Sequence, residues 1–431
     1  MEKKISVIGT GYVGLTAGVG FSKKGNHVTC MDIDNDRINK IKSGEIPIYE
    51  PKIKNILKES INKNLFEATT NLDYAIKNSD ISFICVPTPT KDNGEQDTSF
   101  VETISKRIGK CLKNKANYHV IVVKSTVIPG TTENIVIPNV VRFSRKKAGQ
   151  DFGICMNPEF MREGSALDDF LEPDRIVIGE FDKRSGNDLY EIYNKFNKPI
   201  IRTTIKTAEM IKYVSNSFLA TKISFSNEIG NICKQFGINF YEVIDGVSLD
   251  KRISPHFLNA GVGFGGSCFP KDVKALVKEA ENTGYNPKLL KSILNLNETQ
   301  PYILINLLKR RLGGSLKGKE IAILGLSFKP NTDDIREAPS IKIVNKLIED
   351  GANVRVYDPK AMDNFKRIFP NVVYSHTPKG ALDGAHACLI ITEWKEFENL
   401  DERDFNLMQK KIIIEGRKVL DKNINFEGVC W

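Results

Sequence analysis

The sequence lacks the features of a membrane-spanning or secreted protein. None of its 431 residues belongs to a run of 18 consecutive apolar residues, which argues against a transmembrane helix. The N-terminus passes from Met-Glu-Lys-Lys straight into an apolar strand pattern, without the apolar core and cleavage site of a signal peptide. We therefore expect a cytoplasmic protein.

Metal-binding and nucleic-acid-binding motifs are missing as well. The eight cysteines include no Cys-x-x-Cys pair and no His/Cys cluster with metal spacing, so we expect no metal site. Zinc fingers, RNA-binding sheet motifs and basic zippers do not occur. The net charge of +9 is spread along the chain and suits an anionic small molecule. We expect neither nucleic acid nor a membrane as a partner.

The first motif that is present is a dinucleotide fingerprint. A strand pattern at Lys4–Ile8 leads into Gly9-Thr-Gly-Tyr-Val-Gly14, and Leu15–Lys24 then has a helical pattern. A second strand, Val28–Met31, ends at Asp32, where a carboxylate binds the ribose hydroxyls and repels the extra phosphate of NADP. The pattern predicts an NAD site, with a glycine turn kept only for packing as the alternative. The predicted NAD-binding residues of this motif are Gly9, Gly11, Tyr12, Val13 and Gly14 at the turn, and Asp32 after the second strand.

Strands and helices continue to alternate after the fingerprint. Ile81–Val86 ends in Pro87-Thr-Pro89, and Val120–Val123 ends in a turn that contains Thr126. Such turns place hydroxyl groups at the carboxyl edge of a parallel sheet, where ligands bind, although Thr126 could equally serve as a turn residue or helix cap. We expect Pro173–Gly179 to be the last strand of this domain.

The chain contains an internal repeat. Glu320–Gly325 resembles Lys4–Gly9, and Gly351–Asp358 resembles Gly25–Asp32. The second copy lacks the G-x-G-x-x-G and carries about ten extra residues, at Phe328–Glu337. We therefore predict an α/β protein with two Rossmann-like doubly wound domains joined by a long central helix. The predicted boundaries are 1–200 for the NAD-binding domain, 201–300 for the central helical region and 301–431 for the C-terminal domain.

One cysteine has an unusual setting. Cys268 lies in the glycine-rich stretch Gly261–Asp272, directly before a helical pattern in which Pro270 fits the first helical position. A helix N-terminus favours a thiolate, so Cys268 could be a nucleophile, with a structural thiol as the equal alternative. The other cysteines lie mostly in apolar strand or helix patterns and are expected to be inert.

The middle of the chain predicts a long amphipathic helix at Thr207–Lys234. Lys212 and Asn216 lie four residues apart on it and share one face. Facing a cleft they would form an oxyanion site, but the pattern alone favours the surface. Glu159 follows a strand and is a candidate base, or else an ordinary capping carboxylate.

These pieces together resemble the UDP-glucose/GDP-mannose dehydrogenase family over nearly the whole chain. The motifs that carry the resemblance are Gly9–Leu15, Pro47–Pro51, Val86–Pro89, Ser125–Thr132, Asn157–Gly164, Pro173–Gly179, Gly261–Asp272, Gly325–Ser340 and Gly416–Asp421. The resemblance implies two successive NAD-dependent oxidations of a sugar alcohol to a carboxylate, and a homodimer.

The resemblance also implies roles for individual residues. Cys268 would form a thiohemiacetal and then a thioester, Lys212 and Asn216 would stabilise the oxyanion, Asp272 and Thr126 would orient a water, and Glu159 would assist hydrolysis. Further residues at the NAD site would be Arg37, Pro87, Thr88, Thr126, Glu163 and Arg336. Residues at the nucleotide-sugar site would be Glu159, Phe160, Met161, Arg162, Lys212, Asn216, Arg252 (from the partner of a dimer), Phe257, Leu258, Asn259, Gly261, Phe264, Gly265, Cys268, Phe269, Lys271, Lys329 and Arg417.

The sugar is inferred from two positions beside the nucleophile. Ser267 and Phe269 resemble the UDP-glucose branch and not the amino-sugar or GDP-mannose branches, so we expect UDP-glucose to be oxidised to UDP-glucuronate. A UDP-N-acetylhexosamine, UDP-galactose or GDP-mannose is the alternative substrate. Two other kinds of function are possible for such a sequence. A two-electron NAD dehydrogenase would leave the motif Gly261–Asp272 unexplained. A catalytically silent binding protein would not be expected to keep an intact set of site residues.

Overall fold

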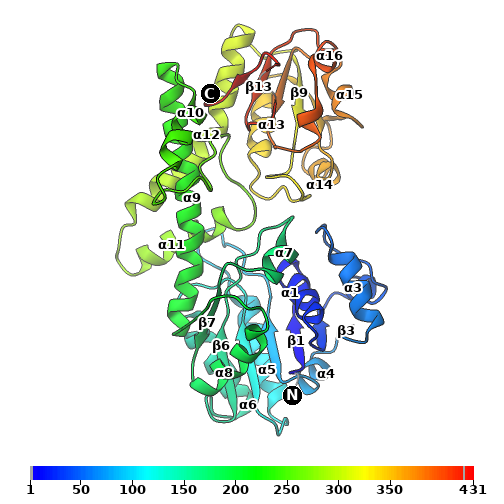
Figure 1. Ribbon diagram of the computed structural model, residues 1–431, viewed down its shortest axis with the longest axis vertical. Coiled ribbons are helices and arrows are strands. Elements are labelled where there is room, and N and C mark those ends of the chain that lie inside the picture. Colours follow the sequence, from blue (N-terminus) through cyan, green and yellow to red (C-terminus); the bar gives the residue numbers. More distant parts are fainter. Residues whose placement is uncertain (1–2, 421–422) are drawn as a thin grey trace. The chain divides into compact units, whose positions relative to one another are not determined.

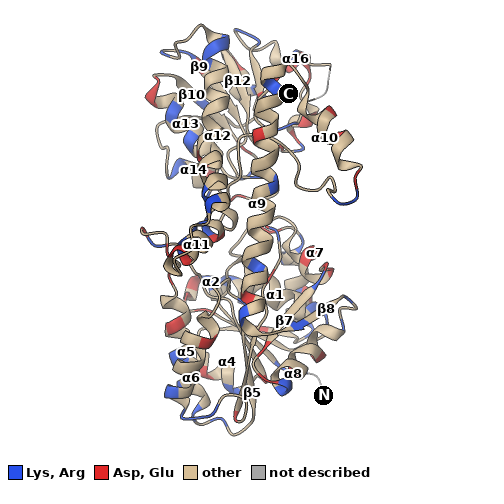
Figure 2. Ribbon diagram, turned by 90° about the vertical axis from the view of Figure 1, so that its left-hand side faces the viewer, with Lys and Arg blue, Asp and Glu red and all other residues tan. Residues whose placement is uncertain are grey.

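The computed structural model describes residues 3–420 and 423–431. It consists of two compact units that divide between Ser215 and Asn216. Each unit contains one largely parallel sheet with its own helices (Figure 1). Lys and Arg are dispersed over both units and are interspersed with Asp and Glu, as the diffuse charge of the sequence predicts (Figure 2).

The first unit is built on an eight-stranded sheet with the order β3-β2-β1-β4-β5-β6-β7-β8. Neighbouring strands are parallel except β6 and β7, which are antiparallel. The strands are β1 (Ile5–Ile8), β2 (Val28–Met31), β3 (Phe66–Thr69), β4 (Ile81–Ile84), β5 (His119–Val123), β6 (Phe152–Met156), β7 (Ile176–Glu180) and β8 (Ile200–Thr203).

Helices cover both faces of this sheet because successive strand residues alternate between two apolar cores. Val7 and Phe83 belong to one core with α1, α3, α7 and α8, while their neighbours Ile8 and Ile84 belong to the other with α4, α5 and α6. The helices are α1 (Tyr12–Lys23), α2 (Asn35–Lys42), α3 (Ile53–Asn62), α4 (Leu72–Lys77), α5 (Ser99–Leu112), the π-helix η1 (Thr132–Val136), α6 (Ile137–Ser144), α7 (Ala166–Leu171) and α8 (Lys183–Asn194).

The expectation that Pro173–Gly179 forms the last strand of this domain is wrong. The strand in that segment is β7, and β8 extends the sheet by one more parallel strand. β8 is a short edge strand with two exposed residues. Its sequence Ile-Ile-Arg-Thr therefore lacks the run of apolar residues from which a buried strand can be predicted. Its Arg202 is tied to Glu180 of β7 by an Nε–Oε2 hydrogen bond of 2.8 Å.

The predicted central helix is α9 (Ile205–Phe236), which has 32 residues. It begins two residues before and ends two residues after the expected Thr207–Lys234. The first three turns belong to the first unit and the remainder to the second.

The second unit contains a six-stranded sheet with the order β11-β10-β9-β12-β13-β14, all parallel. The internal repeat is confirmed, because β9 and β10 pair as β1 and β2 do. The strands are β9 (Glu320–Leu324), β10 (Asn353–Tyr357), β11 (Val373–Tyr374), β12 (Ala387–Ile390), β13 (Ile413–Glu415) and β14 (Glu427–Gly428).

Helices again cover both faces of the second sheet. Ile321 and Ile323 of β9 face a core shared with α10, α12 and α13, while Ala322 and Leu324 face one shared with α15 and α16. The helices are α10 (Phe240–Ser248), α11 (Phe269–Asn282), α12 (Lys288–Leu312), α13 (Pro339–Glu349), α14 (Met362–Lys366), α15 (Pro378–Leu382), the 3₁₀ turn η2 (Phe397–Asn399) and α16 (Glu402–Phe405). None of the helices in the described part of the chain has the length and apolar character that a membrane crossing requires.

Candidate active site

The glycine turn between β1 and α1 has the shape that a dinucleotide needs. A Cβ added to Gly9 would lie 2.6 Å from the carbonyl oxygen of Cys85, and one added to Gly14 would lie 1.8 Å from that of Gly9, so both positions exclude a side chain. At Gly11 nothing lies within 4 Å of the added atom. Gly11 is the N-cap of α1, and no side chain caps the helix there. An open helix start with room above its glycine fits a pyrophosphate.

Asp32 lies at the end of β2, where the prediction placed it. Its Oδ2 accepts hydrogen bonds from the backbone N–H of Thr10 (2.7 Å) and from the Thr10 hydroxyl (2.8 Å). The carboxylate thus stabilises the glycine turn while remaining partly exposed. Tyr12 donates to the carbonyl of Tyr49 (2.8 Å). The remaining predicted NAD residues of this unit have different exposures: Pro87 is exposed, Thr88 is buried, and Arg37 and Glu163 are partly exposed.

Glu159 and Lys212 form a buried ion pair, with 2.8 Å between Oε1 and Nζ. The surface position that the helical pattern favours for Lys212 is therefore wrong, since the residue is only 3% exposed. Burial alone would raise the pKa of Glu159, but Lys212, the N–H of Met161 and Lys124 outweigh it, so the pKa lies below its ordinary value. The site thus holds an ionised carboxylate and an ammonium in contact, both shielded from water.

Phe160 lies beside this pair, with its ring centroid 5.6 Å from Nζ of Lys212. The guanidinium of Arg175 stacks on the ring of Phe160 at 3.7 Å from its centroid, and also donates to Ser215 of α9 (3.1 Å). Arg162 points elsewhere, because it forms an exposed ion pair with Asp169.

A buried polar cluster beneath Glu159 was not anticipated from the sequence. The ammonium of Lys124 donates to Oδ1 of Asn157 (2.8 Å), which also accepts from the hydroxyl of Tyr193 (2.6 Å). The amide of Asn157 donates to the carbonyl of Val177 (2.9 Å). These bonds join the carboxyl ends of β5 and β6 to the amino end of β7, and thereby fix the segment that leads to Glu159.

The loop that carries Thr126 is held by the predicted Thr88 and by further groups outside the predicted set. Its carbonyl accepts from Thr88 (2.9 Å) and from the amide of Gln96 (2.8 Å), which also contacts the hydroxyl of Tyr213 on α9 (3.0 Å). Glu209, one turn before Tyr213, accepts from the backbone N–H groups of Gly130 (2.6 Å) and Thr132 (2.9 Å). α9 therefore positions this loop directly.

In the second unit, Cys268 lies at a helix start, as the sequence predicts, and is the N-cap of α11. The helix begins at Phe269, so Pro270 occupies its second position and not the first. Cys268 is partly exposed, and its Sγ lies 3.6 Å from the hydroxyl of Ser267. A helix N-terminus stabilises a thiolate, and exposure makes the sulfur available for attack. The other seven cysteines are free thiols, and all but Cys111 are buried.

Asp272 lies one turn after Cys268 and is buried between two donors. Its Oδ2 accepts from the amide of Asn216 (2.6 Å), and its Oδ1 accepts from the ammonium of Lys271 (2.5 Å). Asn216 is 5% exposed, so its expected surface position is wrong as well. The aspartate is thus held in one orientation on the first turn of α11.

The segment that leads to Cys268 packs tightly against the C-terminal part of the chain. A Cβ on Gly265 would lie 2.4 Å from the carbonyl oxygen of Glu337, and one on Gly261 would lie 2.6 Å from that of Gly416. Arg417 donates from its Nη2 to the carbonyl of Gly263. The rings of Phe257 and Phe264 both contact that of Phe269, with centroids 6.2 and 6.1 Å away.

The remaining predicted substrate residues have varied environments. Leu258 is buried, and Asn259 is exposed. Arg252 is exposed and is paired with Asp250 (2.6 Å), two residues before it. Lys329 lies over the ring of Phe328 (5.6 Å), and Arg336 forms a two-pronged pair with Asp334. Asp421, the last residue of the Gly416–Asp421 motif, lies outside the described residues.

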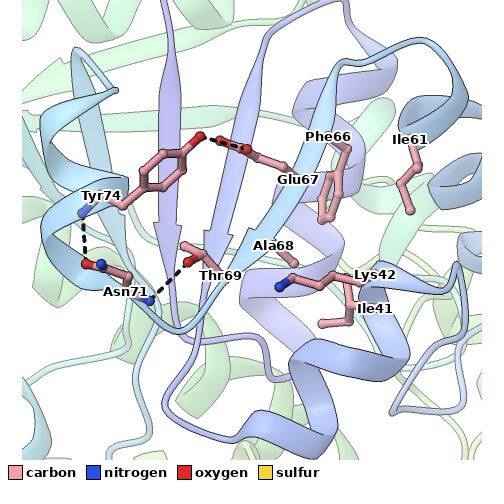
Figure 3. A pocket seen from close by; sticks show the side chains of 9 residues that line it. All are labelled: Ile41, Lys42, Ile61, Phe66, Glu67, Ala68, Thr69, Asn71 and Tyr74. Atoms are coloured by element: carbon pink, nitrogen blue, oxygen red, sulfur yellow. Dashed lines mark hydrogen bonds between the residues drawn. The ribbon is translucent and has the colours of Figure 1, made fainter.

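A cavity of about 500 Å³ lies elsewhere, at the edge strand β3 (Figure 3). Its wall includes Glu67 and Tyr74, which hydrogen bond to each other at 3.1 Å, but none of the predicted site residues. Among the described residues, no group of three or more His, Cys, Asp or Glu side chains could hold a metal ion.

Comparison with known proteins places these features in a family. Three models of the UDP-glucose/GDP-mannose dehydrogenase family match the chain: the NAD binding domain at residues 3–197, the central domain at 206–299 and the UDP binding domain at 322–422. The UDP-glucose 6-dehydrogenase AglM of Haloferax volcanii is 41% identical over 424 residues, which cover 97% of each chain. The UDP-glucose 6-dehydrogenase YwqF of Bacillus subtilis is 43% identical, over 96% of this chain and 93% of its own.

Solved structures agree with the sequence matches. The UDP-glucose dehydrogenase of Pyrobaculum islandicum has a TM-score of 0.94 and 38% identity, covering 100% of this chain and 98% of its own. The UDP-D-ManNAc dehydrogenase of Pyrococcus horikoshii has a TM-score of 0.87 and 29% identity, covering 99% of both chains. The chain therefore belongs to the UDP-glucose/GDP-mannose dehydrogenase family, and its first unit contains the NAD-binding domain of that family.

Proposed function

We propose that the protein oxidises UDP-glucose to UDP-glucuronate through a thioester on Cys268. The overall reaction takes UDP-glucose, two NAD⁺ and water to UDP-glucuronate, two NADH and three protons. The turn at Gly9–Gly14 and Asp32 would hold NAD, which supplies the hydride acceptor. We divide the chain into an NAD-binding part (1–200), a central part with the nucleophile (201–300) and a part that binds the UDP-sugar (301–431).

The residues of the chain serve the two oxidations in sequence. The alcohol at C6 first loses a hydride and a proton to become an aldehyde. The Cys268 thiolate then adds to this aldehyde, and loss of a second hydride gives the thioester. The ammonium of Lys212 and the amide of Asn216 stabilise the oxyanions, because buried donors act strongly on charge that develops beside them.

Hydrolysis of the thioester releases the product and the free thiol. Asp272 and Thr126 orient the attacking water, and Glu159 assists the transfer of its proton. Cys268 returns to its starting state when the C–S bond breaks, and the water oxygen becomes part of the product carboxylate.

The observation that carries this proposal is the setting of Cys268. It is the N-cap of α11 and is partly exposed, while Asp272 on the next turn is buried and held by Asn216. A two-electron dehydrogenase needs no thiol at such a position. The 43% and 41% identities to UDP-glucose 6-dehydrogenases favour UDP-glucose over other nucleotide sugars.

A homodimer is part of the proposal. The exposed face of α9 contains Phe218, Phe225, Ile232 and Phe236, spaced by seven, seven and four residues, which places them on one side of the helix. Large exposed apolar patches of this kind mark protein contacts. Arg252, exposed on the loop after α10, would reach the substrate of the partner subunit.

The test is the number of NADH molecules formed per UDP-glucose at completion, with the product identified by mass. We expect two NADH and UDP-glucuronate. The matched variant Cys268→Ser should still bind UDP-glucose and NAD but should make no UDP-glucuronate. One NADH per sugar, or normal product from Cys268→Ser, would contradict the thioester route. No NADH with UDP-glucose but turnover with UDP-N-acetylmannosamine, UDP-galactose or GDP-mannose would reassign the sugar.

A further inference from the structure

Two glycine-containing loops of the second unit pack backbone against backbone. The N–H of Val262 donates to the carbonyl of Gly416 (3.1 Å). A Cβ on Gly416 would lie 2.7 Å from Cγ1 of Val262, and one on Gly261 would lie 2.7 Å from Nη1 of Arg417. Because neither glycine has room for a side chain, a shift of the Gly416 loop must displace the loop that leads to Cys268.

Arg417 adds a second link between the same loops. Its side chain is largely buried and donates to the carbonyl of Gly263, five residues before Cys268. Gly263 has a φ of +100°, a backbone conformation that L side chains rarely adopt. The guanidinium therefore binds the loop before Cys268 at the turn where Gly263 has this left-handed backbone conformation.

Glu415, directly before these residues, determines the shape of the Gly416 loop. Its side chain is fully buried at the end of β13, and its Oε1 accepts the backbone N–H groups of Val419 (2.8 Å) and Leu420 (2.5 Å). These two bonds close the turn that contains Arg417. The other oxygen, Oε2, accepts from the indole of Trp431 (3.3 Å).

We propose that Glu415 is a positioning residue for the nucleophile loop: it closes the turn at 416–420 so that Arg417 holds Gly263, and through it Cys268, in place. The kinetic part of this inference rests on the proposed function. Burial raises the pKa of Glu415 to about 7, which is the cost of keeping a carboxylate away from water, and the backbone donors and Trp431 partly offset it.

The first experiment separates substrate binding from catalysis. Glu415→Ala removes both acceptors, so we expect at least a tenfold increase in KM for UDP-glucose, with KM for NAD changed less than twofold. Glu415→Gln keeps an oxygen for Val419 and Leu420, and should restore KM to within about threefold of the parent. Glu393→Gln is the matched control, because Glu393 is an exposed carboxylate 3.8 Å from Nε of Arg417 and holds no turn. Equal effects of Glu415→Ala and Glu393→Gln would overturn the proposal, because the cause would then be charge near Arg417.

The second experiment does not depend on the reaction. Alkylation by iodoacetamide is followed at the Cys268 peptide by mass spectrometry, with the partly exposed Cys111 of the first unit as internal reference. We expect Glu415→Ala to change the Cys268 rate at least threefold and to leave Cys111 unchanged. If the parent fails to oxidise UDP-glucose but the Cys268 rate responds, the proposed function is wrong and the positioning role stands. If the parent is active and neither KM nor the Cys268 rate responds, Glu415 does not position the loop.

Discussion

At the scale of single residues, the two copies of the internal repeat have equivalent aspartates with different roles. Asp32 and Asp358 each follow the second strand of their repeat. Asp358 is fully buried, and its oxygens accept from six groups of the protein: the N–H groups of Leu326, Ser327, Lys360 and Ala361, the Ser327 hydroxyl and the Trp394 indole. Asp32 is partly exposed and bonds chiefly to Thr10. Of these two carboxylates, only Asp32 retains the capacity to accept hydrogen bonds from a ligand.

Asp32→Asn tests this retained capacity. The amide oxygen can still accept from Thr10, but the negative charge that repels the phosphate of NADP is gone. We expect the ratio of kcat/KM for NAD to that for NADP to fall at least tenfold, which corresponds to about 1.4 kcal/mol. Asp34→Asn is the control, because Asp34 caps α2 by accepting from the N–H of Arg37 (3.0 Å) and should leave the ratio unchanged. An unchanged ratio in Asp32→Asn would mean that Asp32 is not the ribose carboxylate.

Lys124 predicts a dependence of stability on pH. Burial lowers its pKa to about 8, against an ordinary value of 10.5. Folding therefore disfavours the charged form, so this lysine destabilises the fold below pH 8, and the penalty disappears as pH rises toward 10.5. We expect the free energy of unfolding of the parent to rise relative to Lys124→Met between pH 8 and 10, measured by urea denaturation.

The control for Lys124 is an exposed lysine of the same unit. Lys113 follows α5 and is exposed, so Lys113→Met should show no such change relative to the parent. A difference between the parent and Lys124→Met that stays flat from pH 8 to 10 would show that the ammonium is adequately solvated in the folded protein.

At the scale of elements, α12 also holds the nucleophile loop. Asn297 accepts from the N–H of Phe264 (2.7 Å) and donates to its carbonyl (3.0 Å), as a neighbouring strand would. Gln300 donates to the carbonyl of Gly261 (2.8 Å). Pro301 follows inside the helix and has no N–H for the carbonyl of Asn297, so the helix ladder is interrupted where the loop is bound.

Asn297→Ala should therefore loosen Phe264 without unfolding the unit. Two buried backbone groups lose their partner, at a cost of about 1–3 kcal/mol. We expect a lower melting temperature together with a several-fold higher KM for UDP-glucose and an unchanged KM for NAD. Asn295→Ala is the comparison, since Asn295 lies on the same helix and is exposed. An unchanged KM for UDP-glucose in Asn297→Ala would mean that Phe264 does not bind the substrate.

The elements themselves follow from the sequence where their apolar residues recur with a clear period. β1, β2, β4, β5 and α9 lie within two residues of their predicted positions, because each has an apolar pattern of the correct period. β8 was missed because an edge strand with two exposed residues has no such pattern. Pro270 is expected at the first position of α11 but occupies the second. A proline is equally acceptable at both positions, so it does not fix the first residue of a helix.

At the scale of the whole molecule, motifs indicate candidate site residues, but they do not show which contacts hold those residues in place. The position of Cys268 at a helix start follows from local sequence, whereas Asp272 is expected only through the resemblance to the family. The burial of Lys212 and Asn216 does not follow from local sequence, since a helical pattern does not show which face is buried. Asn297 and Lys124 bond to partners far away in the sequence, and such contacts leave no local pattern. Glu415 bonds to nearby backbone groups, but it reaches the nucleophile loop only through Arg417, which is equally invisible in a local pattern.

Assembly is the last property that the surface of α9 predicts. Phe218, Phe225, Ile232 and Phe236 are 64%, 52%, 47% and 75% exposed, a cost in water that a second copy of the helix would remove. We expect the parent to have twice the chain mass of 48.4 kDa in light scattering, and Phe225→Glu/Ile232→Glu to have the mass of one chain. Phe181→Glu changes a residue of the first unit that is 47% exposed, and should leave the dimer intact.

If Arg252 completes the partner's site, the monomeric variant should also lose activity toward UDP-glucose while retaining its affinity for NAD. A monomeric parent with full activity would rule out both the α9 contact and the shared arginine.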